Sequence, residues 1–317
     1  MHPAKSVIFF TTTSGAGYGL LIWLAVLAPF GGLPDGAWFT VAGFALAIGL
    51  VVAGLVSSTL HLGHPERAWR ALSQWRTSWL SREGLAALVT FLPALVWGLA
   101  ALAGGFAAPA AVVFGLITAA GALVTVYCTG MIYASLKAVP AWHNGLTRFA
   151  YPFLSIMTGA GLAIFLLSMF SAAPSTLDTL VEAAIVLFLA GAFLKLAYWR
   201  RIDTAEPVST AETATGLGAI GKVRLLEKPH SGTNYLLREM GFEIARKHAA
   251  KLRRLCLAFG FAAPAVLLLL ALVTSGALPV LAFAAALCAA IGIALERWLF
   301  FAEAKHVMTL YYGQSAV

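Results

Sequence analysis

Long apolar stretches, separated by short polar connections, recur along most of the chain. Each is close to the roughly 20 residues that an α-helix needs to cross a bilayer. Eight such stretches can be delimited, at about residues 7–30, 38–60, 84–104, 110–134, 151–172, 180–198, 255–275 and 279–302. The pattern predicts an all-α integral membrane protein of eight transmembrane helices, with residues 1–317 forming a single membrane domain.

Composition supports this prediction, because 61% of the residues are apolar and only 11% are charged. In a soluble domain, about a quarter of the residues are charged. The first apolar stretch follows Lys5, as a secretory signal would, but the polar run 11–14 interrupts it and no small-residue cleavage pattern precedes Leu33. We therefore expect this stretch to be a retained transmembrane helix.

The basic residues predict how the helices thread the membrane. If the helices alternate in direction, one face carries both termini and the loops 61–83, 135–150 and 199–254; we call it the basic face. All 21 Lys and Arg lie there, provided that Lys195 and Arg297 snorkel to it from their helix ends. The opposite face carries only the acidic residues Asp35, Asp178 and Glu182.

This distribution also predicts orientation and location. Cytoplasmic loops are enriched in Lys and Arg, so we expect a bacterial cytoplasmic-membrane protein with both termini in the cytoplasm. The net charge of +8 then indicates attraction to lipid headgroups rather than to nucleic acid. The basic loop 199–254, whose last residues have helical composition and lead into the seventh span, fits either a collar on lipid headgroups or a docking surface for a partner subunit.

The segment 61–83 of the basic face is rich in His, Arg, Trp and Glu side chains. It reads HLGHPERAWRALSQWRTSWLSRE. Pro65 suits the first turn of a helix, and apolar residues then recur at helical spacing, at Ala68, Trp69, Leu72, Trp75 and Trp79. We expect a short amphipathic helix at the membrane interface between the second and third spans.

His61 closes the second span and Glu83 opens the third, so both are expected at the rim of the apolar zone. Ionisable residues at that depth are costly unless they are paired or functional. A histidine and a partly desolvated glutamate can exchange protons near neutral pH, which suits a quinone site, where two electrons and two protons move. A structural interpretation stays open: Glu83 pairs with a neighbouring Arg or complements the N-terminus of its helix, and His61 caps the second span.

The chain shows no site for chemistry of its own beyond this rim. No nucleophile–base pair, phosphate loop or metal cluster is visible, so whether the chain alone is an enzyme stays undecided and we assign it no catalytic residue. Cys128, Cys256 and Cys288 lie singly in apolar runs, which predicts buried, inert thiols and no zinc or iron–sulfur site.

A set of residues matches the pattern of a known family. These are Ser58–Gly63, Pro65, Arg67-Ala68, Leu72, Ser78, Leu80-Ser81 and Glu83, then Tyr133, Val139-Pro140, Trp142 and Thr147, with Pro3 and Ile8-Phe9 near the N-terminus. They resemble the membrane-anchor subunit family of dimethyl sulfoxide reductase, with its His-to-Glu spacing kept. The resemblance covers the first five spans, about half of the chain, and is loose around Glu296, Phe300 and His306.

Two features depart from the dimethyl sulfoxide reductases themselves, namely the openings 2–11 and 14–19 and the long basic loop. Both resemble the anchor of the cytoplasm-facing, quinone-linked sulfite dehydrogenases, a branch of the same family. The charge distribution places the 61–83 segment in the cytoplasm and favours this branch.

The resemblance implies a subunit that anchors two partners to the membrane. These are a molybdopterin catalytic subunit and an iron–sulfur subunit that carries [4Fe-4S] clusters. It also implies a site for an exchangeable quinone, ubiquinone or menaquinone, at His61 and Glu83, and no haem. We add His64, Arg67 and Trp79 as candidate quinone neighbours, and Arg70, Arg76, Trp142 and Arg148 as candidate docking residues.

Two other functions are open alternatives. A haem b anchor needs axial histidines on facing helices, whereas the histidines here lie on or near the basic face, at positions 2, 61, 64, 143, 230, 248 and 306. A transporter tends to have matched broken helices around a midplane polar site, whereas the charged residues within these spans lie near the span ends. Glycines fit close helix packing better than unwound gates, namely Gly43, Gly49, Gly54, Gly121, Gly159 and Gly161.

Overall fold

The computed structural model describes residues 2–60, 62–227, 248–274 and 276–317, together with positions 229, 230, 232, 234 and 240. Within this part of the chain, eight helical spans are long and apolar enough to cross a membrane, which confirms the predicted all-α membrane architecture. They are α1 (Lys5–Leu27), α2 (Ala37–Thr59), α3 (Trp79–Gly104), α4 (Pro109–Ala134), α5 (Gly145–Met169), α6 (Pro174–Thr204), a seventh span made of α9 (Ala249–Leu257), the π-helical turn η4 (Ala258–Ala262) and α10 (Ala263–Val273), and α11 (Leu278–Ala302).

Four spans, α3, α5, α6 and the seventh, extend several residues beyond the apolar runs that predicted them. α3 and α5 begin several residues earlier than predicted because polar caps satisfy their first amides. The Ser78 hydroxyl accepts a hydrogen bond from the Ser81 amide, and the side-chain oxygen of Asn144 accepts one from the Thr147 amide at 3.1 Å. Hydropathy alone does not register such caps.

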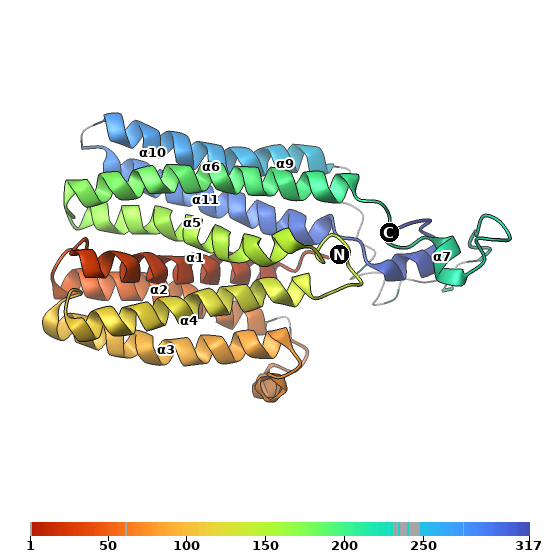
Figure 1. Cartoon of the computed structure of the whole chain (residues 1–317), viewed down its shortest axis with the longest axis horizontal. Coiled ribbons are helices and arrows are strands. Elements are labelled where there is room, and N and C mark those ends of the chain that lie inside the picture. The colour runs from red at the N-terminus through yellow and green to blue at the C-terminus, as the bar shows by residue number, and fades with distance from the viewer. Residues whose placement is uncertain are drawn as a thin grey trace.

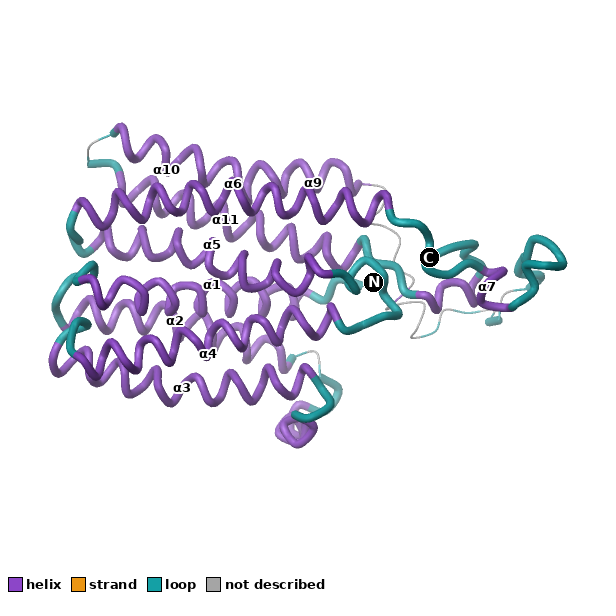
Figure 2. Tube along the Cα trace, in the orientation of Figure 1, coloured by secondary structure: helices purple, strands orange, loops and turns teal. Residues whose placement is uncertain are grey.

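The spans lie side by side in an elongated bundle (Figures 1 and 2). α1 packs against α2, α4 and α5, and α3 packs chiefly against α4. α5 also contacts α6 and α11, and the seventh span packs against the same two helices. α1 and α5 therefore join the first four helices to the last four.

A glycine pair brings α1 and α5 into close contact. A Cβ added to Gly19 of α1 would lie 1.9 Å from the Ser155 carbonyl oxygen of α5, and one added to Gly159 would lie 2.1 Å from the Gly19 carbonyl carbon. Only glycine permits this approach, as predicted for Gly159. Gly49 does not fit the prediction, because a Cβ added there meets no atom within 4 Å.

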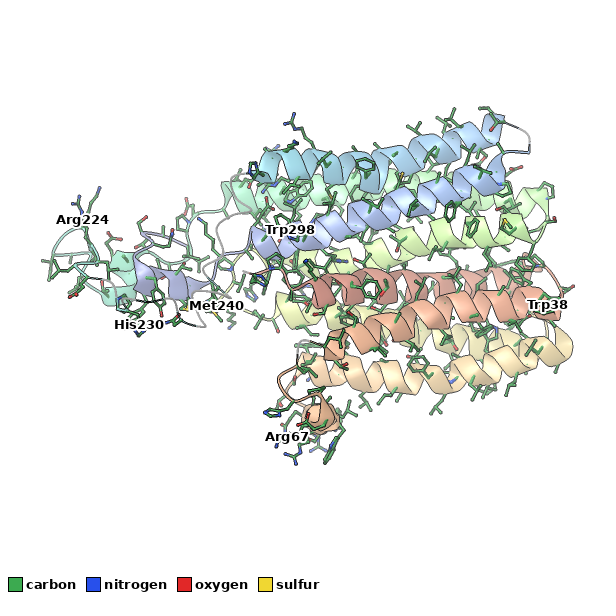
Figure 3. All side chains as sticks on the ribbon, turned by 180° about the vertical axis from the view of Figure 1, so that it is seen from behind. Trp38, Arg67, Arg224, His230, Met240 and Trp298 are labelled. Atoms are coloured by element: carbon green, nitrogen blue, oxygen red, sulfur yellow. The ribbon has the colours of Figure 1, made fainter. Side chains whose placement is uncertain are left out.

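Both chain ends and the short helix α7 (Ala211–Thr215) lie at one end of the bundle, as the alternating threading requires (Figure 1). Arg67 lies at that end and Trp38 at the other (Figure 3). The bundle end with the termini is thus the basic face. The predicted loop 199–254 is shorter than expected, because α6 runs to Thr204; positions 241–247, which have helical composition, lie outside the described residues.

Candidate functional site

The segment between α2 and α3 folds as predicted into a short helix at the basic face. It is a 3-10 helix, η2 (Pro65–Gln74), with Pro65 in its first turn. The start of α3 holds it in place: the Ser81 hydroxyl donates to the Ala71 carbonyl, and the Arg82 guanidinium donates to the carbonyls of Trp75 at 2.8 Å and Arg76 at 2.7 Å. The guanidinium of Arg82 is therefore engaged with this connection.

Glu83 is buried inside the bundle one turn into α3, with 4% of its surface exposed. The hydroxyl of Thr129 on α4 donates a hydrogen bond to its carboxylate. Within the described part of the chain, no Lys, Arg or His nitrogen comes within ion-pair distance of this carboxylate. The described residues therefore do not form the ion pair between Glu83 and a neighbouring Arg that the structural interpretation expected.

Phenol and thiol groups lie on the helices packed around Glu83. Tyr18 of α1 and Tyr133 and Cys128 of α4 all lie within electrostatic range of its carboxylate. Tyr133 packs edge-on against Trp142, with ring centroids 5.2 Å apart, and stacks on Tyr151 at 5.5 Å. Glu83 and Tyr133, which belong to the two stretches that match the family pattern, therefore lie near each other.

The other quinone candidates have different surroundings. His61 lies outside the described residues. His64 and Arg67 are exposed and both pair with the exposed Glu66, at 3.0 Å and 3.6 Å. Trp79 lies at the start of α3, where the Arg82 guanidinium stacks 4.3 Å from its ring centre. The structure therefore keeps Trp79 on the helix of Glu83 but directs the imidazole of His64 and the guanidinium of Arg67 to Glu66.

The candidate docking residues differ in their exposure. Arg70 and Arg76 are exposed on η2 and the turn that follows it, and Arg148 is exposed in the first turn of α5. Trp142 is buried, and its indole donates a 2.8 Å hydrogen bond to the Phe300 carbonyl. Trp142 therefore cannot contact a partner directly and can only support the docking residues from inside the bundle.

A buried ionic cluster was missed by the sequence analysis. Lys195 and Arg297 do not snorkel: both are 2% exposed and they flank Glu296, which is 1% exposed. The Lys195 ammonium lies 2.6 Å from one Glu296 oxygen, and the Arg297 guanidinium lies 3.2 Å from the other. Because a charge in the membrane is stable only with a partner, three ionisable residues inside two apolar runs could have indicated this cluster.

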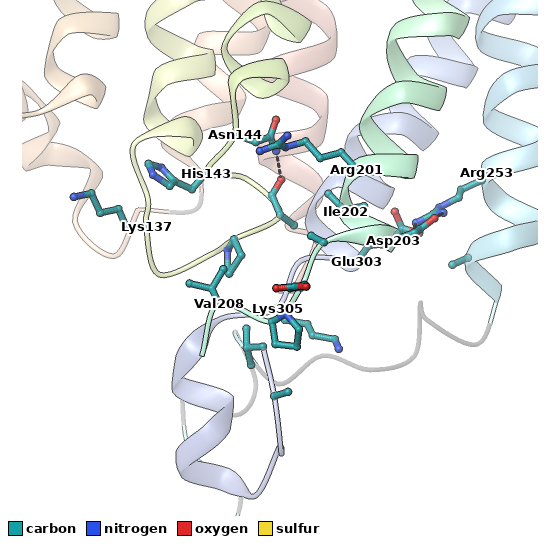
Figure 4. Close-up of a pocket in the computed structure, with 18 residues that line it drawn as sticks. Lys137, His143, Asn144, Arg201, Ile202, Asp203, Val208, Arg253, Glu303 and Lys305 are labelled. Carbon is teal, nitrogen blue, oxygen red and sulfur yellow. Dashed lines mark hydrogen bonds and ion pairs between the residues drawn. The ribbon is translucent and has the colours of Figure 1, made fainter. Parts of the chain in front are cut away.

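A pocket of about 540 Å³ opens at the basic face, between the ends of α6, α9 and α11 (Figure 4). Charged side chains of both signs line it, including Arg201, Asp203, Arg253, Glu303 and Lys305. Arg253 lies 2.6 Å from Asp203 and 2.8 Å from Glu303. Burial raises the pKa of the Glu303 carboxyl above its ordinary value, and hydrogen bonding to Arg253 opposes this shift.

An apolar groove of about 590 Å³ runs between α2 and α3. Its lining includes Phe44 and Gly49 on α2 and Phe91 and Gly98 on α3. Phe91 lies about 12 Å along α3 from Glu83, given a rise of about 1.5 Å per residue. The two helices make few contacts with each other, which leaves the groove between them.

Comparison with known proteins decides the family. A family model for the dimethyl sulfoxide reductase anchor subunit matches residues 1–313. The chain belongs to this family. The likeness to these anchor subunits therefore continues beyond the five spans over which it was first noted.

Among relatives of this anchor subunit, the C subunit of sulfite dehydrogenase from Allochromatium vinosum is 34% identical over 335 residues, covering all of both chains. The anaerobic dimethyl sulfoxide reductase chain YnfH of Escherichia coli is 30% identical over 118 residues, covering 37% of this chain and 41% of that one. An anaerobic dimethyl sulfoxide reductase chain of Haemophilus influenzae is 28% identical over 120 residues, covering 38% and 43%. The resemblance to the sulfite dehydrogenase branch is thereby confirmed.

Proposed function

We propose that this anchor subunit carries electrons between a membrane quinone and an iron–sulfur subunit of a molybdopterin oxidoreductase complex. A sulfite dehydrogenase-type complex is favoured, since that relative aligns over its full length, and a dimethyl sulfoxide reductase-type complex is the second candidate. The observation that carries the proposal is the buried Glu83 carboxylate at the basic face, held by one hydroxyl and no described cation.

Quinone chemistry needs such a group. Oxidising a quinol to a quinone releases two electrons and two protons, and reducing a quinone takes up the same numbers. A carboxylate beside a ring oxygen accepts or returns one of these protons, and His61, which follows α2 in the sequence, is the proposed partner for the other. The electrons pass to or from the nearest iron–sulfur cluster of the partner, which therefore has to dock on the basic face.

The apolar groove between α2 and α3 supports access from the lipid. A quinone is anchored in the bilayer by a long isoprenoid tail, so its head has to reach Glu83 from the side. The groove lies along the helix of Glu83 and offers a lining of aromatic and aliphatic side chains, which is the chemistry of that tail. Docking of the soluble partners is proposed for the exposed Arg70, Arg76 and Arg148, since guanidinium groups form bidentate pairs with carboxylates.

Replacement of one carboxylate tests the proposal. In the intact complex, Glu83→Gln should abolish quinone-linked turnover, while activity with a soluble artificial electron carrier persists, because the partner subunits keep their own chemistry. Glu182→Gln, which changes an exposed acid in α6, is the matched control and should alter neither activity. Loss of both activities in Glu83→Gln would make this carboxylate structural.

A further inference from the structure

A small cavity is lined both by the residue that holds Glu83 and by a residue of the buried ionic cluster. Its volume is about 10 Å³, which is close to the smallest space that holds one ordered water. Thr129, the hydrogen-bond donor of Glu83, lines it together with Arg297 and Tyr151. The cavity thus borders one residue that contacts the carboxylate of α3 and one residue of the cluster of α6 and α11.

Polar atoms around this cavity lack partners. The Nε of Arg297, the hydroxyl of Tyr151 and the hydroxyl of Thr12 are buried, and none has a hydrogen-bond partner among the described residues. Other hydroxyls of the lining are satisfied by backbone carbonyls, as those of Ser14 and Thr158 are. Because unpaired buried donors are costly, a cavity bordered by them is the environment in which an ordered water is expected.

The donors around such a water have a consistent direction. Arg297 can only donate, since a guanidinium has no acceptor. A water that accepts from Arg297 or Tyr151 can donate to the Thr129 oxygen, while the Thr129 hydroxyl donates to Glu83. Every proton in this series of hydrogen bonds points toward the carboxylate, and each hydrogen bond polarises the next.

The cluster also carries a charge excess. Two cations, Lys195 and Arg297, flank the single carboxylate of Glu296, so the three side chains bring one net positive charge. The Arg297 guanidinium lies 3.7 Å from the ring centre of Tyr151. Tyr133, which packs on Tyr151, lies within electrostatic range of both Glu83 and Arg297.

We propose that the cavity holds an ordered water joining Arg297 and Tyr151 to Thr129, and, building on the proposed function, that this link makes Arg297 the positioning residue that favours the ionised form of the Glu83 carboxylate. Arg297 touches neither quinone nor Glu83 and acts through the water and Thr129.

The titratable groups near Glu83, on its own helix and on the helices packed against it, do not supply a cation that is free to act on its carboxylate. They are Tyr18 on α1, Arg82 on α3, and Cys128 and Tyr133 on α4. Arg82 is the one cation in this described set, and its guanidinium is bonded to the carbonyls of the connection from α2. Arg297 of the cluster, by contrast, shares a cavity with Thr129, the hydrogen-bond donor of Glu83.

Infrared titration of the full chain in nanodiscs tests this proposal without any turnover. The carboxyl band that disappears in Glu83→Gln belongs to Glu83, and its midpoint pH is then followed in variants. Arg297→Gln should move the midpoint upward by about one pH unit, a tenfold change in proton affinity, while Lys195 still pairs with Glu296. Arg297→Lys should restore much of the shift, because it returns the charge.

A second variant isolates the water. Tyr151 lines the cavity with a buried hydroxyl that has no partner among the described residues, so Tyr151→Phe removes one donor to the water and leaves every charge intact. It should raise the midpoint in the same direction as Arg297→Gln. Tyr198→Phe is the control for loss of a buried tyrosine hydroxyl outside the cavity and should leave the midpoint unchanged.

The outcomes separate the two proposals. An unchanged midpoint in Arg297→Gln would overturn the link to the cluster, and a shift in Arg297→Gln without one in Tyr151→Phe would overturn the role of the water. Failure of the proposed function would appear elsewhere, as quinone-linked turnover that survives Glu83→Gln, while the titration still reports the link.

Discussion

Two buried glutamates lie near the basic end of the bundle, and their surroundings differ. Glu296 has a cation on each side, at 2.6 Å and 3.2 Å. Glu83 has one hydroxyl donor and, among the described residues, no cation at ion-pair distance. A carboxylate that is compensated by two cations is a fixed structural charge, whereas one that lacks a cation can be compensated by a proton. Glu296 therefore stabilises the fold, whereas Glu83, under the proposed function, exchanges protons.

The largest expected effect breaks the compensated site. Glu296→Gln leaves two buried cations without a carboxylate and should cost about 3–5 kcal/mol of stability, whereas Glu83→Gln should leave the fold nearly unchanged. Thermal unfolding of both variants in the same detergent measures the difference. Equal destabilisation of the two variants would remove the distinction between the sites.

A smaller effect is expected at the hydroxyl that holds Glu83. Thr129→Val keeps the shape of the side chain but leaves the carboxylate without its donor, at a cost of about 1–3 kcal/mol. Quinone-linked turnover should fall while activity with a soluble carrier is kept, and Thr129→Ser should restore turnover. If Thr129→Val behaved as the wild type, the hydrogen bond to Glu83 would have no part in the chemistry.

The smallest effect is expected in the apolar groove between α2 and α3, which is the proposed path of the quinone to Glu83. Gly49→Phe should fill the groove between α2 and α3, displacing about two CH₂ groups of an isoprenoid tail and raising KM roughly tenfold for a long-tailed quinone. A short-tailed quinone should be unaffected. Leu92→Phe, on an exposed face of α3 that does not line the groove, is the control; a KM that rises equally for both quinones would place the tail elsewhere.

The pattern of apolar and polar residues predicted the architecture well, because the bilayer is the solvent of the helices. A bilayer requires every backbone amide to be bonded within its own helix, so length and hydropathy were enough to find the eight spans. Helix starts were predicted less well where capping by Ser78 and Asn144 lengthened α3 and α5. The snorkelling assigned to Lys195 and Arg297 was wrong, because snorkelling assumes that the nearest stabilising partner is water or headgroup, and here Glu296 is nearer.

The candidate site was predicted in part. Glu83 was singled out because an ionisable residue at the edge of a span is costly, and its deep burial agrees with that reasoning. His64 and Arg67 were chosen by proximity in the sequence, yet the local turn of η2 lets both pair with Glu66 instead. Neither Thr129 nor Tyr133 could be linked to Glu83 from the sequence, since they lie on a different helix.

The membrane class, the eight crossings, their alternate threading and the family could all be predicted from the amino-acid sequence. These properties depend on short-range hydropathy, on charge placement and on a motif. The packing of the helices established which hydroxyl holds Glu83, which cations hold Glu296, and that Thr129 and Arg297 line one cavity. Helix rotation and register set these contacts, and they arise from the packing of all the helices together, which no single stretch of the chain encodes.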